Sequence, residues 1–430
     1  MIIKKTIIDI SYLVHWNGRL TGIPRVINEL SVRYNKQENV AFVIWDGRAQ
    51  QFYETELIPA LKTRGEFIHY KTKEGFLYKL ADRLIRFLGF GVIARIVEKV
   101  SKKFKIRFLM GASKILIKAR YSTKVKYYAK TNDVFVITMG DWQSRSYINT
   151  IKKLRQKNVK LIQFCYDMLP IVTPQYSGHA TKTMTKYNLA IFPIVDKILS
   201  ISEHTKRDVV QWLEAQNLHV PTIDVFRLGD DFDVIKQKTL SKRLDDKLAL
   251  QKKKYILCVG TIEARKNHAL LYYVYKLAKA RKIELPQLIV VGRIGWQGDG
   301  AFDLMTKDPE VNQSIKVVKN ATDQELAWLY ENAMFSVYPS FYEGWGLPIA
   351  ESIAHGITCL TSNSSSMPEI AGDLIDYFNP VSPEDCLEKI LKLVDTEYMK
   401  SSLARIKSFK KTTWEETYNQ VDNYVKELYV

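Results

Sequence analysis

Cysteine is scarce in this sequence of 430 residues, and the four that occur are Cys165, Cys258, Cys359 and Cys386. No two of them have the close spacing of a zinc site or a redox dithiol, which argues against both kinds of site. Cys165, Cys258 and Cys359 each lie within a strand-like apolar run. We therefore expect reduced core thiols, as in a cytosolic protein.

Long apolar runs, short-period repeats and low-complexity tracts are missing as well. No run approaches the roughly 18–20 residues that a membrane-spanning helix needs. Residues 1–9 are too short and too interrupted by lysine for a secretion signal. The 46% hydrophobic and 26% charged content is that of a globular protein. We expect a globular, cytoplasmic protein without a transmembrane segment.

Acidic residues are outnumbered, 46 against 64 basic ones, which leaves a net charge of +18. The excess is concentrated in residues 79–130, where fifteen Lys or Arg accompany only Asp82 and Glu98. Apolar residues fall at helical spacing in the same region, which predicts a basic amphipathic insertion at about 75–130. Such a segment is typical of a peripheral protein at an anionic membrane surface, here the inner face of the cytoplasmic membrane.

Three other interpretations of this segment stay open. Its apolar face can pack on the domain, its cations can be solvated, or the patch can bind nucleic acid. No nucleic-acid-reading motif accompanies the charge, so we expect no nucleic-acid partner.

The length fits two domains rather than one core. Strand-like and helix-like patterns alternate along the chain, which predicts an α/β fold with parallel sheets. The expected strands of the first half are 6–12, 40–45, 133–139, 159–166, 197–202 and 224–228. Those of the second half are 255–261, 287–292, 315–318, 335–338 and 358–361. We assign a first domain to 1–235, a linker to 236–253, a second domain to 254–405 and a final amphipathic helix to 406–430.

The most informative stretch is 341–352, which reads Phe-Tyr-Glu-Gly-Trp-Gly-Leu-Pro-Ile-Ala-Glu-Ser. Gly344 and Gly346 stand between a strand-like run and a helical pattern that begins near Pro348. Glycines at such a junction allow close approach to a ligand, with free N–H groups at the positive helix end. Two acids, Glu343 and Glu351, can hold hydroxyl groups beside this anion site. The combination indicates a ligand with both phosphate and polyol parts, such as a nucleotide sugar.

A second strand-to-helix turn carries two adjacent cations, Arg265 and Lys266, after the apolar run 255–261. Arginine can contact two phosphate oxygens at once, whereas lysine acts as a point charge. Adjacent basic residues are usually a solvated face. In combination with the glutamate stretch, they are candidates for binding a diphosphate.

These two stretches resemble the signature of retaining glycosyltransferases of family 4. The resemblance implies the GT-B fold, in which two Rossmann-like domains face each other across a cleft. It also implies roles for the second-domain residues. Glu343 would contact the transferred sugar and Glu351 the ribose. The backbone of Gly344, Trp345, Gly346 and Leu347 would contact sugar and diphosphate, and Arg265 and Lys266 would neutralise the leaving group. Many relatives carry Arg where this chain has Thr261.

Two places in the first half resemble the other wall of the family's cleft. Gly22 and Pro24 mark a turn into a helix, similar to the glycine loop that faces the donor phosphates. Asp167 follows the strand 159–166 and is the candidate that orients the acceptor hydroxyl or the donor sugar. Many relatives have His where this chain has Tyr166. An aspartate that stabilises a turn is the competing interpretation of Asp167.

Weaker signals complete the candidate site. Arg293, in the loop 292–296, resembles a family residue near the nucleotide, although a surface loop explains it equally well. The acid cluster Asp230, Asp231 and Asp233 resembles a metal site, but the cationic phosphate site makes a catalytic metal unnecessary. We expect no metal and no cofactor. Ser202 is the expected N-cap of a helix.

The resemblance implies a hexosyltransferase that moves a sugar from a nucleotide-diphosphate donor to a lipid-linked glycan in bacterial surface polysaccharide synthesis. Mannose and rhamnose are the expected sugars, with GDP-mannose favoured as donor. Two alternatives remain: a sugar-nucleotide epimerase of the same architecture, and a non-catalytic, membrane-bound assembly subunit.

Overall fold

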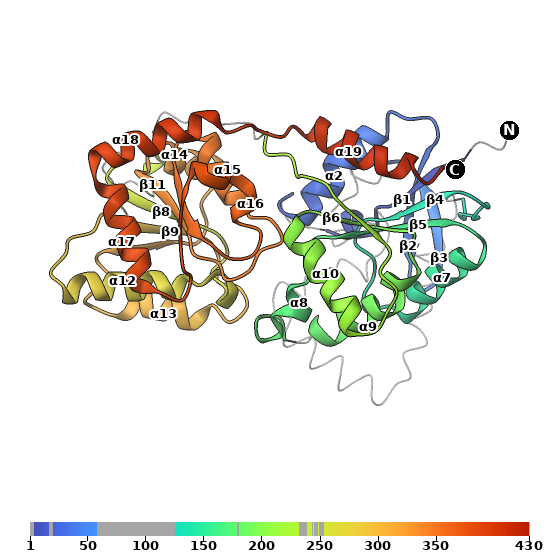
Figure 1. Ribbon diagram of the computed structural model, residues 1–430, viewed down its shortest axis with the longest axis horizontal. Coiled ribbons are helices and arrows are strands. Elements are labelled where there is room, and N and C mark those ends of the chain that lie inside the picture. The colour runs from blue at the N-terminus through green and yellow to red at the C-terminus, as the bar shows by residue number, and fades with distance from the viewer. Residues whose placement is uncertain are drawn as a thin grey trace, which may run out of the picture.

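The computed structural model describes residues 4–16, 20–57, 125–178, 180–231, 239–242, 244, 248 and 253–429. These residues form two α/β lobes that lie next to each other (Figure 1). The predicted basic insertion lies outside the described residues except for 125–130, as does most of the predicted linker.

The first lobe contains a seven-stranded sheet in the order β3-β2-β1-β4-β5-β6-β7. All neighbouring strands pair in parallel except β2 and β3. The strands are β1 (Thr6–Asp9), β2 (Val40–Asp46), β3 (Gln51–Thr55), β4 (Val134–Ile137), β5 (Lys160–Cys165), β6 (Lys197–Ser200) and β7 (Thr222–Val225). The central strands β1 and β4 are buried along their whole length, as expected for a sheet with helices on both faces.

The second lobe contains a six-stranded, wholly parallel sheet in the order β10-β9-β8-β11-β12-β13. Its strands are β8 (Tyr255–Val259), β9 (Gln287–Val291), β10 (Ile315–Val318), β11 (Phe335–Tyr338), β12 (Cys359–Ser362) and β13 (Asp376–Phe378). Because the carboxyl ends of parallel strands share one edge, the loops after β8 and β11 meet there.

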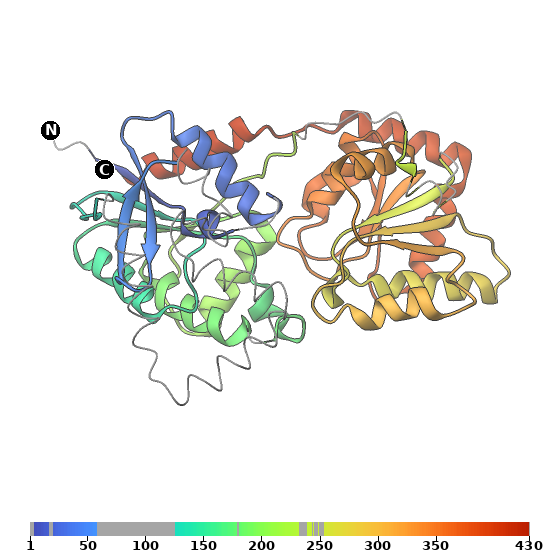
Figure 2. The same cartoon turned by 180° about the vertical axis from the view of Figure 1, so that it is seen from behind.

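Helices cover both faces of each sheet (Figures 1 and 2). Those of the first lobe are α1 (Ser11–His15), α2 (Ile23–Tyr34), α7 (Arg145–Gln156), α8 (Leu169–Val172), α9 (Ala180–Ile191) and α10 (Glu203–Ala215). Those of the second lobe are α12 (His268–Ala280), α13 (Asp299–Lys307), α14 (Asp323–Asn332), α15 (Leu347–Ala354), α16 (Pro368–Ala371), α17 (Pro383–Val394) and α18 (Thr396–Arg405). Among the described helices, none combines the length and apolar character that a membrane span requires.

The last helix, α19 (Trp414–Lys426), belongs spatially to the first lobe, although it follows the second in the chain. A capping box of Thr413 and Glu416 starts it. Its Tyr418 packs edge-on against Tyr34 of α2, with ring centroids 5.0 Å apart. The chain therefore crosses between the lobes twice.

Four strands differ from the sequence-based expectation. The strand expected at 6–12 ends at Asp9, and α1 begins at Ser11. We did not expect β3, a polar edge strand that pairs antiparallel with β2 after a tight turn with Gln50 at φ 53°. We also did not expect β13, which has only three residues at the opposite edge of its sheet. The strand expected at 224–228 runs instead from Thr222 to Val225. Edge strands bury little side-chain surface, so their apolar pattern is weak.

Candidate active site

The glycine loop after β11 has the backbone geometry that its sequence predicts. Gly346 has φ 129°, a conformation that side-chain-bearing residues rarely adopt, and directly precedes α15. Pro348 stands in the first turn of that helix, where its missing N–H costs no hydrogen bond. The chain thus turns sharply from the sheet edge into a helix whose N-terminus faces the other lobe.

A run of serines after β12 holds this loop in place. Ser364 Oγ donates to the Phe341 carbonyl at 3.0 Å, and Ser366 Oγ donates to the carbonyls of Glu343 at 2.9 Å and Trp345 at 2.7 Å. The Glu343 N–H in turn donates to Ser365 Oγ at 3.1 Å. This support was not expected from the sequence, although the serine-rich stretch 362–366 directly after a strand was a usable signal.

The two predicted cations lie against the predicted acid. Arg265 Nη1 is 2.7 Å from one Glu343 oxygen, Oε2, and Lys266 Nζ is 2.6 Å from the other, Oε1. Both cations stand in a short 3-10 turn between β8 and α12. The Phe341 N–H donates to the Arg265 carbonyl at 2.9 Å, so the two loops are also joined through their backbones. Residues about 80 positions apart in the sequence therefore form one cluster.

Two neutral donors complete the surroundings of the Glu343 carboxylate. Its Oε1 accepts from the Tyr338 hydroxyl and from Ser340 Oγ, each at 2.9 Å. With Arg265 and Lys266 this makes four donors, three of them at Oε1 and one, Arg265, at Oε2. Because each carboxylate oxygen has two lone-pair positions, Oε2 can accept one further donor, such as a sugar hydroxyl.

The ion pairs within this cluster affect the pKa values of Glu343 and Lys266. Burial alone would raise the pKa of Glu343, but the ion pairs with Arg265 and Lys266 outweigh burial and lower it to about 2. Burial also lowers the pKa of Lys266, and Glu343 offsets only part of that effect. Glu343 is thus fully ionised at neutral pH and holds the two cations at the sheet edge.

The first lobe contributes the opposite wall. Asp167 follows β5, and its Oδ1 accepts the Leu169 N–H at 3.0 Å. Burial raises the pKa of Asp167, and the nearby Arg265 offsets part of the rise. Gly22 precedes α2 at φ 56°, so the N-terminus of that helix lies at the same wall.

One cavity between the lobes brings most of the predicted site together. Its volume is about 230 Å³. The predicted residues among those that line it are Gly22, Asp167, Arg265, Lys266, Glu343, Gly344, Trp345, Gly346 and Leu347. The structure therefore assembles residues from both lobes around one space.

Two predicted donor residues, Glu351 and Arg293, are not among those that line this cavity. Glu351 lies in α15 and accepts the Tyr330 hydroxyl at 3.1 Å, and burial raises its pKa. Arg293 is exposed in the loop after β9. Their contacts with a nucleotide stay predictions.

Contacts between the lobes hold the cleft in a closed arrangement. Glu369 of α16 accepts the N–H groups of Glu203 and His204 at the start of α10, both at 2.7 Å. Phe341 stacks on Tyr176 with ring centroids 5.7 Å apart. At Gly344, an added Cβ would lie 2.0 Å from the Tyr166 carbonyl oxygen of the first lobe. None of these contacts was expected from the sequence, because each joins residues more than 150 positions apart.

The remaining sequence candidates have structural partners. Asp230 Oδ1 accepts the Thr412 N–H at 2.6 Å, and Asp231 Oδ1 accepts the Trp414 N–H at 3.1 Å, so these acids position the start of α19. Asp233 lies outside the described residues. Ser202 is the N-cap of α10, as predicted. Within the described ranges, no cluster of three or more His, Cys, Asp or Glu has the arrangement of a metal site.

Known proteins of similar sequence or structure agree with the resemblance to glycosyltransferases. Residues 241–412 match the family model "Glycosyl transferases group 1". O-antigen chain mannosyltransferase B from Escherichia coli is 34% identical over 176 residues, which are 40% of this chain and 46% of that protein. Serotype-specific mannosyltransferase WbdA from Escherichia coli is 27% identical over 270 residues, which are 61% of this chain and 32% of that protein. The chain thus spans less than half the length of these relatives.

Among solved structures, Anabaena Alr3699/HepE, crystallised with UDP and glucose, has a TM-score of 0.61. The match covers 99% of this chain and 100% of that one at 12% identity, so it shows the fold alone. The GT-B fold predicted from the sequence is confirmed. Residues 241–412 are thus similar to the group 1 glycosyl transferases, and the chain has the GT-B fold, with two Rossmann-like domains that face each other across a cleft.

Proposed function

We propose that this protein is a retaining glycosyltransferase that moves a hexose, with mannose favoured, from a nucleotide-diphosphate sugar to a saccharide acceptor. The observation that carries the proposal is the cluster of Arg265, Lys266 and Glu343 in the cavity between the lobes, opposite Asp167. It combines a cationic site for a diphosphate with carboxylates that can bind hydroxyl groups.

The two cations act on the leaving group. When the bond between the anomeric carbon and the diphosphate oxygen breaks, negative charge develops on that oxygen. Arg265 and Lys266 are already oriented by Glu343, so little reorganisation is needed as the charge develops. The N–H groups at the start of α15 add to this field. Because the protein itself supplies this positive charge, we propose that the reaction is metal-independent.

The acceptor hydroxyl approaches from the first lobe. Retention, which the resemblance implies, requires attack from the face that the leaving group vacates. The acceptor proton then passes to the diphosphate oxygen, and the new bond joins the acceptor oxygen to the anomeric carbon. Asp167 is placed to orient this hydroxyl or the donor sugar, and contacts such as Gly344 against Tyr166 exclude water that would otherwise hydrolyse the donor.

The choice of mannose rests on the names of both relatives, and the choice of a surface-polysaccharide acceptor rests on the first, which is named for O-antigen chains. A lipid-linked acceptor agrees with the basic segment 79–130, which we propose binds the anionic inner face of the cytoplasmic membrane. Retention on vesicles that contain anionic lipid at moderate salt tests this part. Failure to bind them would refute membrane association without affecting the transfer reaction.

The transfer reaction is tested with GDP-mannose, UDP-glucose and other nucleotide sugars, first by thermal shift and then by product analysis. We expect GDP-mannose to stabilise the fold by mass action and to yield an α-linked product only when acceptor is present. Conversion of the nucleotide sugar without acceptor would indicate the epimerase instead. Absence of binding and of turnover with every donor would favour the non-catalytic subunit.

A further inference from the structure

The first domain contains a second hollow, away from the cavity between the lobes. It has a volume of about 350 Å³ and lies at the carboxyl ends of β1, β2 and β4. That volume is in the range of small-molecule sites. Its walls combine aromatic and polar side chains, among them Tyr12, Trp45, Trp142, Asp9, Asp141 and Gln143. Neither the family match at 241–412 nor the proposed chemistry involves this region.

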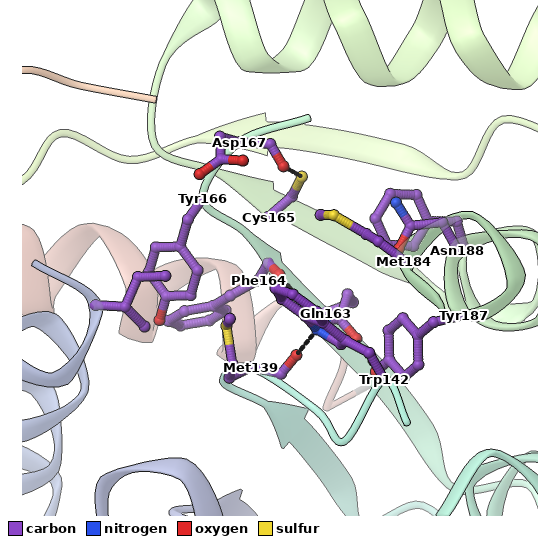
Figure 3. Close-up of a pocket in the computed structure, with 12 residues that line it drawn as sticks. Met139, Trp142, Gln163, Phe164, Cys165, Tyr166, Asp167, Met184, Tyr187 and Asn188 are labelled. Atoms are coloured by element: carbon purple, nitrogen blue, oxygen red, sulfur yellow. Dashed lines mark hydrogen bonds between the residues drawn. The ribbon is translucent and has the colours of Figure 1, made fainter. Parts of the chain in front are cut away.

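A small pocket of about 40 Å³, whose lining residues are drawn in Figure 3, has walls in common with both the hollow and the cavity between the lobes. It shares Met139 and Trp142 with the hollow, and Tyr166 and Asp167 with the cavity between the lobes. In Figure 3, Asp167 lies at one end of this pocket and Trp142 at the other. The three spaces therefore have walls in common, from Asp167 in the cavity between the lobes to Trp142 in the hollow.

The charged residues at the two ends differ. The cleft carries Arg265 and Lys266 beside Glu343 and Asp167, whereas in the part of the chain that the structure describes neither lysine nor arginine lines the hollow, which carries the carboxylates of Asp9 and Asp141 besides His15. A phosphate group would be repelled there. Neutral hydroxyl groups can instead donate to carboxylate oxygens. The hollow thus has the chemistry of an uncharged saccharide site.

Some polar groups of the hollow are already hydrogen-bonded within the protein, whereas others can still bond to a ligand. Asp9 accepts from Ser11 and, at 2.6 Å, from the Tyr147 hydroxyl, so it anchors the loop after β1. Among the described residues, the Asp141 side chain accepts a hydrogen bond only from the Gln143 N–H, at 3.2 Å through Oδ1. Its Oδ2 is available to a ligand.

Two tryptophans complete the recognition surface. The Trp142 ring is fixed because its Nε1 donates to the Met139 carbonyl at 3.2 Å, and it remains partly exposed. The electron-rich face of such a ring attracts the polarised C–H groups of a sugar. Trp45 is 4% exposed, and its Nε1 finds no hydrogen-bond partner in the part of the chain that the structure describes. A buried donor without a partner is costly unless a ligand or water satisfies it.

We propose that this hollow is a subsite for a neutral sugar of the acceptor that is remote from the attacked hydroxyl. The acceptor would extend from Asp167 past Met139 to Trp142, so that the protein recognises more than the terminal sugar of the chain. This inference rests on the proposed function. It adds that the protein recognises an acceptor of more than one sugar, which is uncharged where it contacts the hollow.

The test compares a mannose glycoside with the corresponding α-mannobioside and α-mannotrioside as acceptors for GDP-mannose. For the wild type we expect kcat/KM to rise about tenfold from the monosaccharide to the trisaccharide, a gain of about 1.4 kcal/mol. In Trp142→Leu and Gln143→Ala this ratio should fall towards one. Tyr128→Ala removes a 68% exposed aromatic ring of the same domain and should keep the full ratio. A ratio near one in the wild type would overturn the subsite.

Binding of mannotriose without donor gives a readout that does not depend on transfer. We expect saturation-transfer NMR signals from mannotriose with the wild type and their loss in Trp142→Leu. If Trp142→Leu does not fold, loss of the signals in Asp141→Asn decides, since this variant keeps the Oδ1 acceptor but removes the negative charge and replaces Oδ2 by an amide donor. Saccharide binding without transfer from any donor would refute the proposed function and leave the subsite standing. Transfer without mannotriose binding would refute the subsite and leave the proposed function standing.

Discussion

Lys266 Nζ lies 2.6 Å from Glu343 Oε1, although the two residues belong to different loops of the second sheet. Their pairing determines what the cleft can do. The carboxylate orients a buried lysine and offsets part of the effect of burial on its pKa, and the lysine with Arg265 keeps the carboxylate ionised. A diphosphate that enters the cavity therefore meets cations whose desolvation is already partly compensated.

Replacement of Lys266 by methionine should abolish most of the activity. The side-chain volume is kept, but one of the two cations that stabilise the departing diphosphate is lost. We expect kcat to fall by about 10²–10³, with far-UV circular dichroism unchanged. Lys307→Met, at a 73% exposed lysine of α13, is the matched control and should turn over like the wild type. Near-normal turnover of Lys266→Met would remove this residue from the reaction.

Glu343→Gln should change how stability depends on pH. The pKa of Glu343 is lowered from 4.5 to about 2 in the folded protein, so its ionisation stabilises the fold above the unfolded-state pKa. That contribution, on the order of 3 kcal/mol, is lost as pH falls from about 4.5 towards 2. The difference in the free energy of unfolding between wild type and Glu343→Gln should therefore be large at pH 6 and shrink below pH 4, as measured by denaturant titration. A difference independent of pH would contradict the ion pairing.

Gly344→Ala should impair closure of the two lobes. The new Cβ would lie 2.0 Å from the Tyr166 carbonyl oxygen, and neither backbone can yield without separating the cleft walls. A displacement of about 1 Å at the reacting groups costs about 100-fold in rate. We expect that loss in kcat/KM, together with a larger radius of gyration by small-angle scattering. Gly300→Ala, with open space around its Cβ, is the control. Equal activity of the two variants would show that this contact does not control closure.

Glu369→Ala should weaken the closed arrangement in a different way. It removes the carboxylate that accepts two N–H groups at the start of α10 and interacts with the positive end of that helix. We expect about 1–2 kcal/mol less stability and a higher KM for the donor, since fewer molecules are closed. Glu388→Ala, at a 65% exposed glutamate of α17, should leave both values unchanged. A KM equal to that of the wild type would separate this contact from donor binding.

Local sequence determined the parts of the site that lie within one strand-turn-helix unit. Gly346 can adopt φ 129° because it lacks a Cβ, and Pro348 suits the first turn of α15, so this turn could be predicted from a few adjacent residues. The same holds for Arg265 and Lys266 at the end of β8. Backbone conformation and the placement of charge at strand ends depend mainly on neighbours in the sequence.

Only the tertiary structure decided which of these units meet. The order β8-β11-β12 places Arg265, Glu343 and the serines of 362–366 together, and nothing in the linear pattern specifies strand order. The contacts of Glu369 with α10 and of Gly344 with Tyr166 further require one particular orientation of the two lobes. Such contacts depend on the packing of segments more than 150 residues apart, whose pairing no local periodicity or turn signal encodes.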